Sequence, residues 1–225
     1  MTYTVIARCA RTSQMGIGIA TYSLAVGGYC PVVRGGLGAV STQAFVNLKL
    51  GTLALRLLEQ GFAPTKVMAE LADDDPQIDY RQIGIVDATG GVAVHTGAST
   101  RPWSGHVTGA GYITMGNVLA GKGVVAAMAA AFEDNEGEDL DERLLRVLEA
   151  GRDAGSHLNE RSAAVIVHEH REYGHIDLRV DAHERAVDEL RRVHAVYKPF
   201  VPYYQLRHDN PAETPAQDVW ARENL

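Results

Sequence analysis

The chain has 225 residues, a formal net charge of −7 and a sequence pI near 5.7. This length favours one large domain, which buries enough surface to fold without disulfides or a structural metal. An apolar content of 46% and a charged content of 22% exclude a disordered or collagen-like chain. The acidic balance argues against a general nucleic-acid binder.

Charge and glycine are distributed unevenly along the chain. Residues 1–60 hold five Lys and Arg and one acid, Glu59, so their net charge is +4. Because the whole chain carries −7, residues 61–225 carry a net charge of −11. Of the 23 glycines, 18 lie before residue 122. No apolar run reaches the roughly 18 residues of a membrane span, and the first residues lack a signal-peptide pattern. Because Cys9 and Cys30 form no CxxC motif, we expect a cytoplasmic protein with reduced thiols.

The first elements predict a hairpin that begins at the second residue. Residues 3–9 and 15–21 alternate in polarity, as half-buried strands do. The second strand has one face of small residues, which are Gly16, Gly18 and Ala20. Such a face allows another backbone or a ligand to approach closely.

Strands and helices then alternate. Strands are expected at 37–42, 81–87, 91–97, 110–116, 163–168 and 176–180, and helices at 46–60, 64–72, near 124–132 and 140–148, and at 183–197. The helix at 46–60 has little polar face, so we expect it to be buried on most sides or to face a partner subunit of a homo-oligomer. This order predicts the α+β class, with sheets packed together and covered by helices.

The C-terminal part differs in composition from the rest. Four of the eight prolines lie between residues 199 and 215. We therefore expect one domain over residues 1–197, followed by an extended tail over 198–225 with aromatic anchors. The tail is expected to dock on the body or on a neighbouring subunit.

Thr2 is a candidate nucleophile. Methionine is commonly excised before a small second residue, which would leave Thr2 with a free α-amino group. Such an amine has an ordinary pKa of about 8, so it can be neutral near physiological pH and accept the proton of its own Oγ1. The alternative is an ordinary threonine at the start of a strand, behind a retained Met1.

Several stretches of the chain together resemble one family. They are residues 2–8, 25–27, 36–44, 95–97, 103–106, 116–121 and 177–181. In this order, from residue 2 to about 195, they resemble domain-of-unknown-function family 1028, which is similar to the N-terminal-nucleophile (Ntn) hydrolases. The resemblance implies a four-layer αββα sandwich, and the wider Ntn superfamily cleaves amide bonds.

The resemblance also implies roles for particular residues. Arg34, in a glycine-rich segment, would lower the pKa of the Thr2 amine or bind a substrate carboxylate, and Asn117 would orient the nucleophile or the oxyanion. Backbone N–H groups of Gly36 or Gly38 would form an oxyanion hole. The expected substrate-binding residues are Thr4, Gly36, Gly38, Ser41, Thr42, Gln43 and His95.

Structural roles remain open for these residues. Thr4 is also consistent with a side chain that only fills a strand face, and Arg34 with a surface or structural arginine. Residues 41–43 are consistent with a hydrogen-bonded helix start, and Asn117 with a turn residue.

The sequence as a whole predicts an Ntn-type amidohydrolase that acts on a small acylated amine, amino acid or peptide without a metal or organic cofactor. The surplus of arginine in the first quarter favours a small-molecule substrate with a carboxylate, and neither nucleic acid nor a membrane is expected as a partner. The alternative is a non-catalytic Ntn-fold protein that retains Met1 and binds a ligand or partner. A metal-dependent hydrolase through His168 and His170 is a third hypothesis. Ser156 and Leu158 replace an Asp and an Arg of related chains, a departure that bears on specificity or activity.

Overall fold

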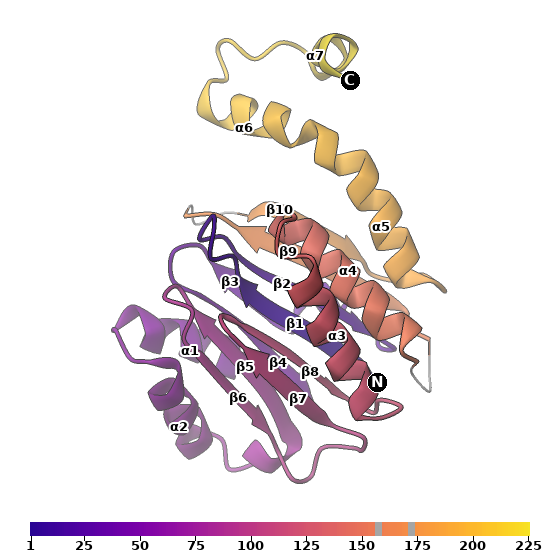
Figure 1. Cartoon of the computed structure of the whole chain (residues 1–225). Coiled ribbons are helices and arrows are strands. Elements are labelled where there is room, and N and C mark those ends of the chain that lie inside the picture. The colour runs from indigo at the N-terminus through magenta and orange to yellow at the C-terminus, as the bar shows by residue number, and fades with distance from the viewer. Residues whose placement is uncertain (156–158, 171–173) are drawn as a thin grey trace.

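Two antiparallel sheets lie face to face in the computed structural model, which describes residues 1–155, 159–170 and 174–225 (Figure 1). The six-stranded sheet has the order β10-β9-β2-β1-β8-β7, and the four-stranded sheet the order β3-β4-β5-β6. The strands of the larger sheet are β1 (Thr2–Arg8), β2 (Met15–Thr21), β7 (Gly105–Gly109), β8 (Tyr112–Asn117), β9 (Ser162–His168) and β10 (Gly174–Val180). Those of the smaller sheet are β3 (Pro31–Arg34), β4 (Gly38–Ala44), β5 (Arg81–Asp87) and β6 (Val92–Thr96).

Helices cover the outer face of each sheet (Figure 1). The smaller sheet carries α1 (Leu48–Glu59) and α2 (Pro64–Asp74), and the larger sheet carries α3 (Lys122–Asp134), α4 (Leu140–Asp153) and α5 (Ala186–Tyr197). Short 3₁₀ turns span Val26–Gly28, Ile78–Tyr80 and Lys198–Phe200. The four-layer αββα sandwich of the α+β class is thereby confirmed. No helix in the described ranges is long and apolar enough to cross a bilayer.

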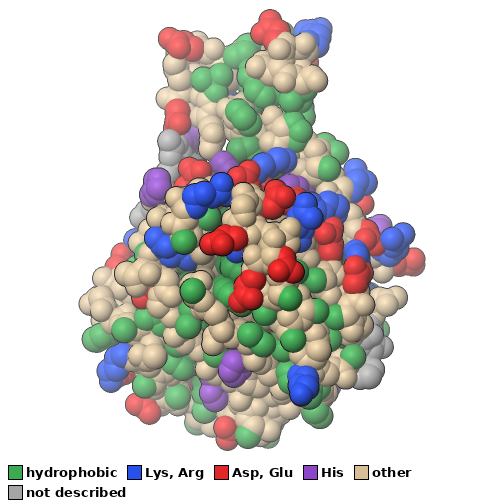
Figure 2. All heavy atoms as spheres, in the orientation of Figure 1, with side chains coloured by type: hydrophobic (Ala, Val, Ile, Leu, Met, Phe, Trp, Pro, Cys, Tyr) green, Lys and Arg blue, Asp and Glu red, His purple; other side chains and the backbone are tan. Residues whose placement is uncertain are grey.

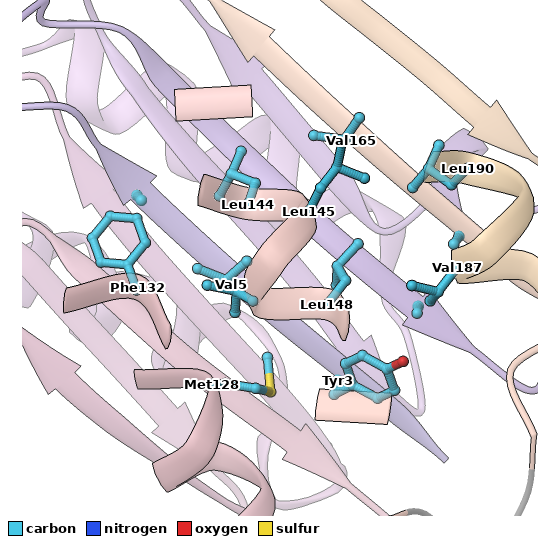
Figure 3. Packing of buried hydrophobic residues seen from close by; sticks show 14 of the residues in the cluster. Tyr3, Val5, Met128, Phe132, Leu144, Leu145, Leu148, Val165, Val187 and Leu190 are labelled. Carbon is cyan, nitrogen blue, oxygen red and sulfur yellow. The ribbon is translucent and has the colours of Figure 1, made fainter. Parts of the chain in front are cut away.

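Three apolar clusters separate the four layers. Tyr3 and Val5 of β1 pack against α3 and α4, as Figure 3 shows, whereas Ile6 faces the smaller sheet. This division follows from the period of two in a strand, which sends neighbouring side chains to opposite faces. The third cluster lies between the smaller sheet and its helices and includes Leu50 and Ile83.

The small-residue face of β2 receives a helix. A Cβ added to Gly16 would lie 2.7 Å from Leu144 Cδ1 and 2.9 Å from the carbonyl oxygen of Ile166. A Cβ added to Gly18 would lie 3.3 Å from the backbone oxygen of Leu144. The glycines therefore allow α4 to approach the sheet closely. The face was expected to admit either another backbone or a ligand, and the backbone of α4 lies there.

Some acidic residues of the second half pair with arginines between the outer helices. Arg191 of α5 bonds Glu142 and Glu149 of α4, at 2.5 and 2.7 Å. Figure 2 shows blue and red side chains intermixed over this face. The acidic residues thus serve as partners for arginines on a solvated helix layer.

The expectation of an extended C-terminal tail is wrong. Residues 201–209 form α6 (Val201–Asp209) and residues 217–224 form α7 (Gln217–Asn224), which lies beyond α6 (Figure 1). α6 contacts the sandwich, because Val201 belongs to the apolar cluster of the larger sheet and Gln205 Nε2 lies 3.0 Å from His175 Nδ1 of β10. Pro199 and Pro202 lie in first turns, where a helix needs no N–H from proline. Trp220 packs on Tyr203 with ring centroids 5.4 Å apart, which ties α7 to α6. The domain boundary near residue 197 stays a prediction.

Candidate active site

The core between the sheets changes from apolar to polar at one end. On the inward face of β1, Ile6 is followed toward the N-terminus by Thr4 and Thr2. In register, Thr2 pairs with Thr21 of β2 and with Asn117 of β8. These three residues therefore lie side by side at the end of three neighbouring strands.

A network of buried side chains forms the floor of this end. Gln82 is its centre: its Oε1 accepts from Gln43 Nε2 at 2.8 Å and from Asn117 Nδ2 at 3.3 Å. Its Nε2 donates to Thr96 Oγ1 at 3.0 Å and to the carbonyl of Gly116 at 3.0 Å. Thr4 Oγ1 donates to Gln43 Oε1 at 2.5 Å. We call Thr4, Gln43, Gln82, Thr96 and Asn117 the polar network.

Thr2 is the half-buried residue above this floor. Its Oγ1 lies 2.8 Å from Thr21 Oγ1, and Thr21 Oγ1 donates its proton to the carbonyl of Met1 at 2.7 Å. Since a hydroxyl carries one hydrogen, Thr2 must be the donor to Thr21. The N–H of Tyr22 also donates to the Met1 carbonyl, at 3.1 Å. Two donors therefore hold an amide carbonyl next to the Thr2 hydroxyl.

The N-terminal amine lies partly inside the protein. Met1 is 9% exposed and belongs, with Leu119, to the apolar cluster between the larger sheet and α3 and α4. Partial burial and the positive charge of Arg101 lower the pKa of the Met1 α-amino group below its ordinary value. An amine in this environment gives up its proton more readily than one in water.

Two residues with left-handed backbones border the site. Ala44 has φ = 70° and directly follows Gln43, and Val118 has φ = 57° and directly follows Asn117. Non-glycine residues rarely adopt this conformation, which costs roughly 1–3 kcal/mol each and is concentrated at functional sites. The strain lies where β4 and β8 end beside Thr2.

The structure brings some of the predicted site residues together. Thr2, Thr4, Gln43 and Asn117 share the polar end of the space between the sheets. Ser41 shares the inward face of β4 with Gln43, and its buried hydroxyl has no hydrogen-bond partner in the described part of the chain.

Other predicted residues lie elsewhere. Gly38 begins β4, roughly 17 Å along the strand from Gln43, and Arg34 pairs with Glu59 of α1 at 2.7 Å. Gly36 lies in the turn between Arg34 and Gly38. The structure therefore does not place an oxyanion hole from Gly36 or Gly38, or the Arg34 charge, beside Thr2.

The side chains of Thr42 and His95 lie on the helix-covered face of the smaller sheet, opposite to the face that packs on the larger sheet. Thr42 Oγ1 bonds the carbonyl of Asn47 at the start of α1, and His95 Nε2 lies 3.0 Å from the carbonyl of Ile78. Both contacts are on the helix-covered side, away from Thr2.

Sequence reasoning missed Thr21, Gln82, Thr96 and Arg101. The hairpin pairing already places residue 21 opposite residue 2, and a glutamine inside the apolar strand at 81–87 indicates a buried polar role. Thr96 becomes recognisable only with the pairing of β5 and β6, and Arg101 only with the loop before β7.

The metal hypothesis gains no ligand set. His168 ends β9, and within the residues the structure describes no group of three or more His, Cys, Asp or Glu is arranged to hold a metal ion. Ser156 and Leu158, where the sequence departs from related chains, lie outside the described residues.

Comparison with known proteins identifies a family and a similar solved structure. The model of a family of unknown function, DUF1028, matches residues 2–190. The crystal structure of protein SPO2555 from Silicibacter pomeroyi, of the same family, is 28% identical, covers 88% of this chain and 86% of its own, and superposes with a TM-score of 0.82.

Two other solved structures are less similar. HslV from Trypanosoma brucei is 12% identical over 75% of this chain and 99% of its own, with a TM-score of 0.49. Anbu, the ancestral β-subunit, from Yersinia bercovieri is 10% identical over 95% of this chain and 98% of its own, with a TM-score of 0.42. Among curated proteins, none matches the sequence. With 189 consecutive residues matched by the family model, from residue 2 to residue 190, the chain belongs to the DUF1028 family.

Proposed function

We propose that the chain, once Met1 is removed, is an amide hydrolase in which Thr2 Oγ1 is the nucleophile and the Thr2 α-amino group is the base. The observation that carries this proposal is the bound amide carbonyl of Met1. Its oxygen accepts from the Thr21 hydroxyl and the Tyr22 N–H. Its carbon is separated from Thr2 Oγ1 only by the N, Cα and Cβ atoms of Thr2. The Met1 carbonyl thus stands in for the acyl group of a substrate.

The proposed reaction follows from these positions. The neutral amine takes the proton from Oγ1 as Oγ1 attacks the substrate carbonyl carbon. The Thr21 hydroxyl and the Tyr22 N–H, released from Met1, bind the oxygen on which negative charge develops. The resulting ammonium returns its proton to the leaving amine, and an ester remains on Oγ1. The amine then deprotonates a water molecule that hydrolyses this ester and regenerates Thr2.

The polar network supports this chemistry by fixing the strand ends. Thr4 donates to Gln43, and Gln43 and Asn117 both donate to Gln82. The residues around Thr2 therefore have little freedom to move. A preorganised site avoids reorganisation during the reaction, which is the main source of electrostatic rate enhancement. We assign Thr4 and Asn117 to positioning in this proposal.

A second candidate is a non-catalytic protein that keeps Met1 and binds a ligand or partner. The way Met1 is held favours this candidate. Met1 is almost fully buried, and its carbonyl accepts from the Thr21 hydroxyl and the Tyr22 N–H. In that form Thr2 carries an amide nitrogen, which has no basic lone pair. Assembly into a homo-oligomer and a cytoplasmic location remain predictions in either case.

The two candidates are separated by preparing both N-termini. The intact mass of the purified native chain shows whether Met1 is present, and a cleavable leader allows preparation of protein that begins with Thr2. A panel of small amides is then assayed by mass spectrometry with both forms. We expect turnover only in the form that begins with Thr2, abolished by T2A and retained in part by T2S. T108A, at an exposed threonine of β7, is the matched control. Quantitative retention of Met1 together with an inactive Thr2-first form would favour the second candidate.

A further inference from the structure

Arg101 reaches across the end of the sandwich where Thr2 lies. Its carbonyl accepts from the Val118 N–H at 3.2 Å, and Val118 follows Asn117, the partner of Thr2 in β8. Its guanidinium carbon lies 5.3 Å from the ring centroid of Phe45, just beyond the end of β4. The backbone of Arg101 is therefore attached to the larger sheet, and its charge lies over a residue of the smaller one.

The charge of Arg101 has no carboxylate beside it. In the described ranges no Asp or Glu oxygen lies within ion-pair distance of its guanidinium, which is exposed. Arg81, which bonds the carbonyl of Phe45, is by contrast neutralised by the buried carboxylate of Asp75 at 2.9 Å. Within the described residues, Arg101 thus provides a positive charge without a carboxylate partner at the end of the sandwich where Thr2 lies.

The Phe45 ring under the guanidinium of Arg101 favours binding of an anion to its N–H groups. A guanidinium held over an aromatic face keeps its N–H groups directed outward from its edge. Those N–H groups match the two oxygens of a carboxylate in a bidentate arrangement. Because the ring already restricts the Arg101 side chain, less conformational entropy would be lost when an anion binds.

We infer that Arg101 binds a carboxylate of the substrate, so that the site accepts N-acyl amino acids or short acyl peptides with a carboxylate near the bond to be cleaved. The inference rests on the proposed hydrolase function and specifies its substrate class. In this inference Arg101, and not Arg34 as the sequence suggested, binds the substrate carboxylate. Both the exposed guanidinium and the reacting carbonyl lie at the same end of β1 and β8.

Arg161 is the matched alternative. Its guanidinium also lies 5.3 Å from an aromatic centroid, that of Tyr22, and it has no carboxylate at ion-pair distance in the described part of the chain. Its backbone N–H donates to the Thr21 carbonyl at 2.7 Å, but its side chain lines a surface hollow with Leu24 and Glu184, on the β9 side of Thr21. The charge that acts on the N-terminal amine is that of Arg101. The geometry therefore favours Arg101 and makes Arg161 a suitable control.

The test compares N-acetylalanine with N-acetylalaninamide, using protein that begins with Thr2. The ratio of their kcat/KM values for acetyl release is expected to favour the carboxylate by roughly 10- to 100-fold, the range of a charge-assisted hydrogen bond. R101Q should abolish this preference, mainly through KM for the acid, and R101K should restore part of it. R161Q should keep the ratio. An unchanged ratio in R101Q, or its loss in R161Q, would overturn the inference and leave the hydrolase proposal standing.

A binding measurement separates the two proposals. If the protein that begins with Thr2 releases acetate from neither compound, binding of both to the T2A variant is measured by calorimetry, with and without R101Q. Preferential binding of N-acetylalanine that R101Q removes would support carboxylate recognition even though the hydrolase proposal had failed. Equal affinity for the acid and the carboxamide would overturn it. Thermal unfolding of R101Q confirms that the exposed substitution leaves the fold intact.

Discussion

Replacing Gln82 by leucine tests whether the polar network holds the two sheets together. Gln82 is fully buried, and its Oε1 is the acceptor for the amides of Gln43 and Asn117. Leucine has similar bulk and offers no acceptor, so both amides lose this partner. Each buried donor left unpaired costs about 1–3 kcal/mol. Because the bond from Asn117 is long, at 3.3 Å, we expect a total loss of about 3 kcal/mol in the free energy of unfolding.

The assay is equilibrium unfolding in urea, supported by thermal unfolding. A loss of about 3 kcal/mol corresponds to a melting temperature lower by about 6–12 °C for a domain of this size. Q60L, at an exposed glutamine that ends α1, should stay within about 0.5 kcal/mol of the original protein. Q43L and Q82L combined should cost less than the sum of the single losses, because the two side chains share a bond. A loss below about 1 kcal/mol in Q82L would refute the network as a source of stability.

Three further outcomes follow from contacts outside the network. L148A removes a fully buried side chain on the inner face of α4 and should lower the free energy of unfolding by about 2–5 kcal/mol; a loss below about 1 kcal/mol in thermal unfolding would contradict the packing. Burial alone raises the pKa of Asp141, but hydrogen bonds from His194 and Lys198 outweigh it and hold the pKa at about 2, below the ordinary 3.8. This depressed pKa stabilises the fold by about 2 kcal/mol above pH 4, and the contribution is lost as the pH falls from about 4 toward 2. Urea unfolding should show that D141N removes this pH dependence of the free energy of unfolding. The same pH dependence in D141N and in the original protein would disprove this role of Asp141. R34Q breaks the solvent-exposed ion pair with Glu59, so kcat/KM for an amide substrate should stay within about twofold, whereas a loss of about 100-fold would return Arg34 to the active site.

Local patterns in the sequence were sufficient for the hairpin and the helix layers. Alternation over residues 3–9 assigns Tyr3 and Val5 to one face and Thr4 and Ile6 to the other, as the structure has them. Because the hairpin is regular, its pairing also places Thr21 against Thr2. The glycines of β2 indicated close approach, although not that the approaching segment is α4.

The rest of the candidate site depends on which strand ends meet, and short-range patterns do not contain that information. Arg34 and Gly38 follow the hairpin closely in sequence, yet β4 runs so that its far end, at Gln43, meets Thr4. Consecutive strand residues alternate, so Thr42 cannot share a face with Gln43. Arg101 reaches the site through the loop before β7, a strand that the sequence did not predict.

The C-terminal tail shows a second limit of local patterns. Its prolines suggested an extended chain, but proline is also compatible with the first turn of a helix, and Pro202 occupies that place in α6. Aromatic contacts such as that between Tyr203 and Trp220 then hold the short helices together. Only tertiary packing distinguishes the two outcomes, because such short helices are marginal alone.

Covalent labelling of Thr2 tests the central claim most directly. Protein that begins with Thr2 and protein that retains Met1 are each treated with an acylating β-lactone, and intact mass and peptide mapping locate the adduct. We expect one acyl group on Thr2 in the Thr2-first form, and none at residue 2 in T2A or in the form with Met1, where the nitrogen of Thr2 is an amide. Equal labelling of both forms, or an adduct only at another residue, would contradict Thr2 as the nucleophile.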